Sequence, residues 1–153
     1  SYLGNLINKK TAIILILIIV ILGAYNQMVY SNSLLKEKSK TYMPVKESGL
    51  WLRENSNQND LIISASKPQH IYYSERKVYN IGEMSGANQT EEIFDERIQE
   101  LKPRYLILSV FENIPPWAYS WPQKHNQSVI PIQAYSLEQN NPQPALIIYE
   151  IRY

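Results

Sequence analysis

Residues Thr11–Tyr30 read TAIILILIIVILGAYNQMVY, and this stretch sets the architecture of the chain. Every residue from Ala12 to Ala24 is apolar or glycine. A helix here has no polar face to present to water, so lipid or an enclosed core must surround it. At 1.5 Å per residue the helix is about 30 Å long, which matches the hydrocarbon thickness of a bilayer. The sequence therefore predicts a transmembrane helix over residues 11–30.

The flanks of this helix predict its orientation. Lys9 and Lys10 precede it, and Tyr25 and Tyr30 mark its other end as an interfacial belt. Because basic residues gather on the cytoplasmic side of a membrane, we expect residues 1–10 to be a cytoplasmic lead-in. Everything after Tyr30 then lies outside the cell or in a lumen. The predicted localisation is the membrane, with the lipid bilayer as a partner and a single span in this chain.

Two other readings of the apolar stretch compete with a membrane span. A cleaved signal peptide has a similar basic start, but no A-x-A-like site follows Ala24, and Tyr25-Asn26-Gln27 is a poor cleavage context. A buried core helix of a soluble protein would need a larger chain than 153 residues to surround it on all sides. The sequence begins at Ser1 without methionine and is already apolar in places, so we expect a piece of a longer membrane protein.

Composition excludes several classes of function. Fifteen Lys and Arg against 14 Asp and Glu give a net charge of +1, which offers no electrostatic reason to expect nucleic acid. There is no cysteine, so disulfides and thiolate metal sites are impossible. The two histidines, His70 and His125, lie far apart and lack a second ligand at metal spacing, so no metal site is expected.

After the apolar stretch, residues 31–41 are polar and predict a solvated stalk or a helix leaving the bilayer, and residues 42–153 predict one extracytoplasmic domain. Helix and strand signals alternate within that domain. The expected helices are a segment that begins at Pro44 and ends at Asn55–Asn57, one from Lys67 with Ile71, Tyr72 and Tyr73 as its apolar side, one from Thr90 to Lys102 with Phe94, Ile98 and Leu101 buried, and a short one within Pro116–His125. The expected strands are Leu61–Ser64, Lys77–Ile81, Tyr105–Val110, Val129–Tyr135 and residues 147–153.

Three details refine this pattern. Gly82–Gln89 is expected to be a loop. Because of Pro131, the strand Val129–Tyr135 is expected at an edge of the sheet or with a bulge. Alternation along residues 147–153 predicts one wet face for the last strand. The fold class is therefore α/β: one N-terminal transmembrane helix followed by a small Rossmann-like sheet between helices, with an antiparallel edge strand.

Ligands of such a sheet gather beyond the carboxyl ends of its strands, here Ser64–Lys67 and Ser109–Asn113. No G-x-G-x-x-G or G-x-x-x-x-G-K occurs, which argues against nucleotide binding, and no G-x-S-x-G elbow supports a hydrolase. We interpret Glu83 and Glu112 as solvated loop charges rather than a pair of catalytic carboxylates.

Two sets of candidate site residues remain. Tyr72, Tyr73 and Arg76 offer a cation beside aromatic rings to an anionic or sugar ligand, whereas the alternative places Tyr72 in the core and Arg76 at a helix end as a cap. Asn88 and Asn126 begin the glycosylation sequons Asn-Gln-Thr and Asn-Gln-Ser, both in predicted loops.

Four segments carry a family resemblance: GLWLRENSNQNDLIIS (49–64), HIYYSERKVYNI (70–81), EEIFDERIQELKPRYLILS (91–109) and PALIIYEIRY (144–153). In this order after an apolar helix, they resemble the extracytoplasmic C-terminal domain of GT-C superfamily membrane glycosyltransferases, in the branch of protein O-mannosyltransferases and aminoarabinose transferases. The closest piece is Ile71–Lys77, where such domains tend to have a Tyr-Tyr-Ser-Gly-Arg-like turn. Glu75 stands here in place of that glycine.

The resemblance implies transfer of a sugar from a polyprenyl-phosphate donor, with a divalent metal as a further requirement of the parent enzyme. Its catalytic acidic residues lie upstream of this chain, so no catalytic residue and no cofactor is expected within it. The chain is then an accessory domain that covers the active site, helps to admit a glycan or protein acceptor, or stabilises the upstream transmembrane part.

Two other functions stay open. One is a single-span cell-surface or pilin-like structural protein, and the other is an external module that binds a saccharide or a peptide. The coding sequence upstream of Ser1 separates them: many hydrophobic spans favour the transferase, and a start codon there removes it.

Overall fold

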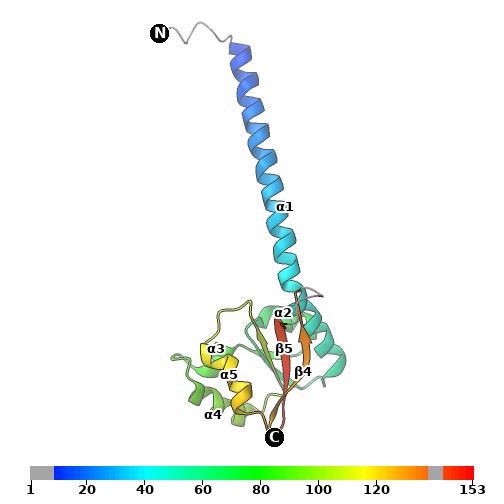
Figure 1. Ribbon diagram of the computed structural model, residues 1–153, viewed down its shortest axis with the longest axis vertical. Helices are drawn as coiled ribbons and strands as arrows, with labels where there is room; N and C mark the ends of the chain where they lie inside the picture. The colour runs from blue at the N-terminus through cyan, green and yellow to red at the C-terminus, as the bar shows by residue number, and fades with distance from the viewer. Residues whose placement is uncertain (1–8, 138–142) are drawn as a thin grey trace. The chain divides into compact units, whose positions relative to one another are not determined.

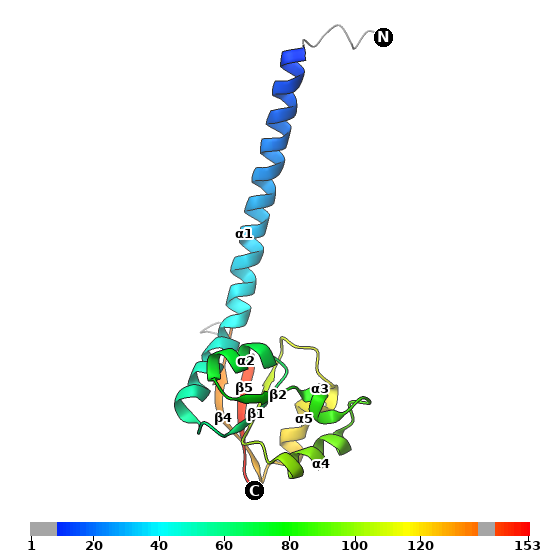
Figure 2. The ribbon, with the colours of Figure 1, turned by 180° about the vertical axis from the view of Figure 1, so that it is seen from behind.

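The computed structural model describes residues 9–137 and 143–153 (Figures 1 and 2). These residues divide into two compact units, with the boundary between Lys40 and Thr41. The first unit contains most of helix α1 (Lys9–Asn55), and the second contains the last part of α1 and everything after it. Each unit is described by itself.

The apolar part of α1 forms the helix that the sequence predicts. Residues Thr11–Lys36 are long and apolar enough to cross a membrane, and none of this segment is buried. Side chains on all sides of it are exposed, Ile19 by 68% and Ile21 by 65%. A helix that is apolar all round is stable only in lipid or against other protein, so the segment is a candidate membrane span.

Helix α1 continues through Pro44, so the prediction of a separate helix beginning there was wrong. A proline inside a helix removes one backbone hydrogen bond, here the bond to the carbonyl of residue 40. The following turn compensates for this loss, because Val45 and Leu52 are buried in the second unit. The helix ends at Asn55, as the sequence predicts.

A five-stranded mixed sheet forms the centre of the second unit, with the strand order β2-β1-β3-β5-β4. Strands β1 (Leu61–Ser64), β2 (Lys77–Tyr79) and β3 (Tyr105–Ser109) are parallel. Strand β5 (Leu146–Ile151) is antiparallel to β3, and β4 (Val129–Tyr135) is antiparallel to β5 at the edge. The α/β class with an antiparallel edge strand is thereby confirmed.

Helices cover both faces of this sheet, and each face has its own core. Helices α3 (Ile81–Ser85), α4 (Glu91–Leu101) and α5 (Pro116–Lys124) lie together on one face in both views. The core under them includes Phe94, Trp121 and Leu106. On the other face the end of α1 packs with α2 (Lys67–Ser74), over a core that includes Leu52 and Ile107.

Local signals confirm several of the predicted elements. The hydroxyl of Thr90 accepts a hydrogen bond from the backbone N–H of Ile93 and caps α4, whose Phe94 and Ile98 are buried. Strand β4 lies at the sheet edge and carries an irregularity between Pro131 and Gln133, as a proline in a strand requires.

Three local predictions were wrong. In α2, Tyr72 is 76% and Ile71 44% exposed, and the buried side chains are His70 and Ser74 instead. Strand β5 has no solvent-exposed face, because Leu146 and Ile148 are buried in the core on one face of the sheet, and Tyr149 and Ile151 pack in the core on the other. The expected loop over 82–89 begins with the short helix α3, which starts at a capping box formed by Asn80 and Glu83.

Candidate functional site

The carboxyl ends of β1, β2 and β3 border a cleft of about 260 Å³, which we call the switch-point cleft. The chain leaves β1 toward β2 on one side and later returns to β3 on the other side of β1. At such a reversal the loops diverge, and open α/β sheets bind ligands there. The cleft is lined by Ala65, Asn80, Ile81, Gly82, Gln89, Glu112, Asn113, Ile114 and Pro115.

Asn80 holds one wall of the cleft in place. Its side-chain nitrogen donates to the Ala65 carbonyl at 3.0 Å, which ties the end of β2 to the end of β1. Its side-chain oxygen accepts from the backbone N–H of Gly82 at 2.8 Å, and its own N–H donates to the Glu83 carboxylate at 2.9 Å. These hydrogen bonds fix the end of β2 to the end of β1 and to the first turn of α3.

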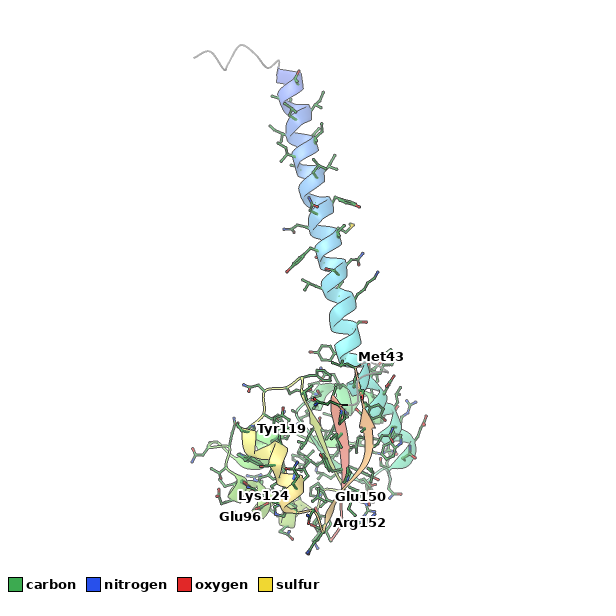
Figure 3. The ribbon with its side chains drawn as sticks, in the orientation of Figure 1. Met43, Glu96, Tyr119, Lys124, Glu150 and Arg152 are labelled. Carbon is green, nitrogen blue, oxygen red and sulfur yellow. The ribbon has the colours of Figure 1, made fainter. Side chains whose placement is uncertain are left out.

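Helix α5 holds the opposite wall. The Tyr119 hydroxyl donates to the Ser109 carbonyl at 3.0 Å and lies 3.5 Å from the Glu112 carbonyl, and Figure 3 shows Tyr119 on this helix. The Trp117 indole N–H donates to the Gln89 carbonyl at 2.8 Å. Both loops that close the cleft are thus anchored to one helix.

The two carboxylates at the cleft, Glu83 and Glu112, lie in different environments. Lys67 donates to both oxygens of Glu83, at 2.7 and 2.9 Å, and this hydrogen bond lowers the pKa of Glu83. Glu112 is half-buried, and burial raises the pKa of its carboxyl. The expectation of a solvated charge at residue 112 was wrong, because Glu112 is partly buried in a loop whose backbone carbonyl Tyr119 contacts.

The predicted group Tyr72, Tyr73 and Arg76 has a different geometry from the one the sequence suggests. The two rings meet edge to face at 5.0 Å, with Tyr72 in solvent. The guanidinium of Arg76 donates to the carbonyls of Arg53 (2.8 Å), Ser56 (2.9 Å) and Ser74 (3.1 Å). Arg76 therefore caps the ends of α1 and α2, as the alternative reading proposed, and a ligand at these three residues stays a prediction.

His70 is the centre of a buried network that the sequence did not reveal. Its side chain is fully buried, with Nε2 2.9 Å from the Ser48 hydroxyl and Nδ1 2.8 Å from the Ser64 hydroxyl. Ser48 donates to the Val45 carbonyl, so it accepts from Nε2–H, and Ser64 then donates to Nδ1. Desolvation lowers the pKa of His70 to about 4, so the ring is neutral. The network joins α1, α2 and β1 and is closed to solvent.

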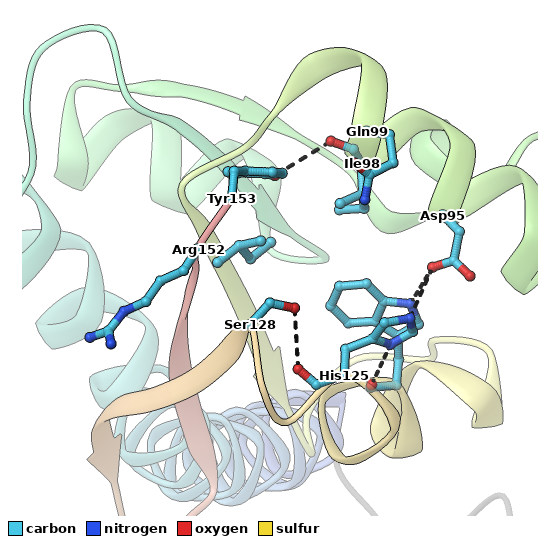
Figure 4. A pocket seen from close by; sticks show the side chains of 9 residues that line it. Asp95, Ile98, Gln99, His125, Ser128, Arg152 and Tyr153 are labelled. Carbon is cyan, nitrogen blue, oxygen red and sulfur yellow. Dashed lines mark hydrogen bonds and ion pairs between the residues drawn. The ribbon is translucent and has the colours of Figure 1, made fainter.

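A second opening of about 270 Å³ lies around His125, at the end of the sheet where its parallel strands begin (Figure 4). The His125 ring stacks on Trp121 at 4.4 Å, and its Nε2 lies 3.8 Å from Asp95, which also accepts the Trp121 indole N–H at 2.6 Å. The Ser128 hydroxyl donates to the His125 backbone carbonyl and not to the ring. These groups satisfy one another and do not form the arrangement of a nucleophile and its base.

Both sequon asparagines lie in turns, as predicted. Asn88 belongs to the turn between α3 and α4, and Asn126 to the turn between α5 and β4. Each is exposed, so the acceptor amide is reachable. Occupation of the two sites stays a prediction.

No protein-family model and no curated protein matches the sequence. Among solved structures, the chain is similar to the C-terminal globular domain of an oligosaccharyltransferase from Archaeoglobus fulgidus, with 13% identity and a TM-score of 0.47. The alignment covers 72% of this chain and 97% of that domain. The function of the chain is therefore inferred from its own residues.

Proposed function

We propose that this chain is the last membrane span and the extracytoplasmic accessory domain of a membrane glycosyltransferase of the GT-C superfamily. The donor of the parent enzyme is a polyprenyl-phosphate sugar, and its catalytic residues lie upstream of the chain. The segments 49–64, 70–81, 91–109 and 144–153, in that order after an apolar helix, support this proposal.

The observation that carries the proposal is the composition of α1 along its length. Residues 11–30 of this helix are apolar and exposed on all sides, whereas Val45, Ser48 and Leu52 of the same helix are buried in the core of the α/β domain. Helix α1 thus contains both a candidate membrane span and residues of the domain core. A candidate span followed in sequence by a folded α/β domain suits the part of an enzyme that works beside a membrane-embedded active site.

The domain serves the enzyme by positioning an acceptor or by stabilising the upstream spans, and residues 31–153 lie on the extracytoplasmic side. Proton transfer on a lipid-linked sugar needs a carboxylate near the bilayer and cations or a metal at the carrier phosphate. The segment between Thr11 and Tyr30 contains no acidic residue. The first acid after it, Glu37, lies in a lysine-rich sequence, so this chain alone has no transferase activity.

Transfer assays on membranes test the proposal. The chain is expressed alone, with its complete upstream coding sequence, and with that sequence but without residues 42–153. We expect labelled sugar to leave a polyprenyl-phosphate donor only with the intact protein, while the truncated protein still inserts into the membrane. Transfer by residues 1–153 alone, with loss in Glu37→Gln, would place the catalytic group in this chain and contradict the proposal. An upstream sequence without further spans would also contradict it.

A further inference from the structure

The switch-point cleft has the size and position of a binding site for one small unit. Its volume of about 260 Å³ lies just below the roughly 300–1,000 Å³ of pockets for drug-sized ligands. It lies where the parallel strands β1 and β3 are adjacent and the connections diverge, and its walls are held by Asn80 and by α5. A site of this kind is largely preformed, so a ligand would not have to order its loops.

The charges of the lining exclude an anionic ligand. The nine lining residues include one carboxylate, Glu112, and no Lys, Arg or His. The ammonium group of Lys67, beside the cleft, already donates hydrogen bonds to both carboxylate oxygens of Glu83. None of the ion pairs between described residues includes Glu112. A phosphate or carboxylate would place a second negative charge beside this half-buried group, where repulsion is screened less than in water.

The polar groups of the lining match hydroxyl groups best. Asn80, Gln89 and Asn113 carry amides, which both donate and accept hydrogen bonds, as a hydroxyl group does. The amide of Asn80 uses one N–H on the Ala65 carbonyl, and its oxygen accepts from the backbone N–H groups of Gly82 and Glu83, which leaves a second N–H donor. An ammonium group only donates hydrogen bonds. It could therefore bind the Glu112 carboxylate, but it could not accept a hydrogen bond from the amide N–H groups.

We propose that the switch-point cleft binds one monosaccharide unit of a neutral glycan, with Glu112, Asn80 and Asn113 as its hydrogen-bonding groups. Ile114 and Pro115, both partly exposed, supply an apolar surface for the C–H face of the ring. The site is independent of the catalytic residues of the proposed transferase. Within that enzyme it would hold a sugar of the acceptor or of the product.

Binding is measured directly on the isotope-labelled chain, residues 1–153, by NMR in a detergent without a sugar headgroup. The probes are glucose, mannose and N-acetylglucosamine, with glucosamine and inorganic phosphate as the cationic and anionic comparisons. For a ligand of this size we expect a Kd on the order of 1 mM for at least one neutral sugar. The backbone signal of Gly82 and the side-chain amide signals of Asn80 and Asn113 should shift in a saturable way.

Two variants decide whether the cleft is the site. Glu112→Gln keeps the size of the side chain and removes the charge-assisted hydrogen bond, so Kd should rise about tenfold. Glu100→Gln, at an exposed position of α4 outside the cleft, should leave Kd unchanged. Asn113 is exposed, so Asn113→Ala should weaken binding without disturbing the fold.

The proposal is overturned if no neutral sugar shifts these signals, if Glu112→Gln and Asn113→Ala bind as tightly as Glu100→Gln, or if only glucosamine or phosphate binds. Because the measurement does not involve transfer, its failure leaves the transferase proposal standing. Equally, loss of the transferase proposal leaves the sugar site standing.

Discussion

Acidification should destabilise the α/β domain through His70, at pH values above those at which the ion-paired carboxylates Glu83 and Glu150 are protonated. The ring is neutral in the folded state, where its pKa is about 4, and has a pKa near 6.5 in the unfolded chain. The unfolded state therefore binds the extra proton between pH 6.5 and pH 4. The stability that His70 contributes is complete above pH 6.5 and is lost as the pH falls toward 4.

The size of this effect follows from the two pKa values. Each pKa unit corresponds to 1.36 kcal/mol, so the free energy of unfolding should fall by about 2 kcal/mol between pH 7 and pH 5, and by about 3 kcal/mol at pH 4. Hydrogen bonds lower the pKa values of Glu83 and Glu150, mainly from Lys67 and Arg152 respectively. Those carboxylates lose their contribution only below their ordinary value of 4.5. Burial raises the pKa of Glu112, so this carboxyl acts with the opposite sign above pH 4.5, and the part of the slope that His70→Gln removes reports on His70.

The assay is urea unfolding of residues 31–153 at several pH values, followed by tryptophan fluorescence. We expect this part of the chain to fold alone, because residues 41–153 form one compact unit. His70→Gln should be less stable at pH 7 and should lose the slope between pH 6.5 and 4.5. His125→Gln, which changes the partly exposed histidine, should keep it. An unchanged slope in His70→Gln, or a flat profile in the unmodified domain, would refute the reasoning.

Three further predictions concern packing, capping and topology. Gly49→Ala should destabilise the domain by about 1–3 kcal/mol in urea unfolding, because the added Cβ would lie 2.6 Å from the Cβ of Tyr73; an unchanged midpoint would show that α2 moves away freely. Arg76→Lys should cost about 1–3 kcal/mol, since an ammonium group cannot reach the same set of carbonyls, and a neutral result would mean that water replaces the cap. In the cysteine-free chain, Glu96→Cys should react with an impermeant maleimide outside intact cells and Asn5→Cys should not, and the reverse pattern would invert the topology.

The parts of the domain that have a local sequence signal, such as an apolar run, a helix cap or a proline, were predictable from the sequence. The apolar run at 105–109 is the central strand of the sheet, and Thr90 caps α4 as its position before Glu91 and Glu92 indicates. Pro131 correctly indicated an edge strand with an irregularity. In each case the signal is local, since a hydrogen bond or a missing N–H within a few residues decides the structure.

The rest depended on contacts between residues far apart in the chain. Ile71 and Tyr72 are apolar by composition, but α2 approaches α1 through Gly49 and buries His70 instead. The partners of His70, Ser48 and Ser64, are 22 and 6 residues away, and no spacing rule connects them. Glu112 is half-buried in a loop whose backbone Tyr119 contacts, and a single sequence cannot distinguish such a residue from a solvated charge.

The two edges of the sheet bear on self-association. Strand β2, at one edge, is only three residues long. Strand β4, at the other, contains a proline that cannot donate and a shift of register beside it. Short strands, prolines and irregular edges prevent another chain from adding a strand. Copies of this domain can therefore lie close to one another without the sheet of one extending into the sheet of the next.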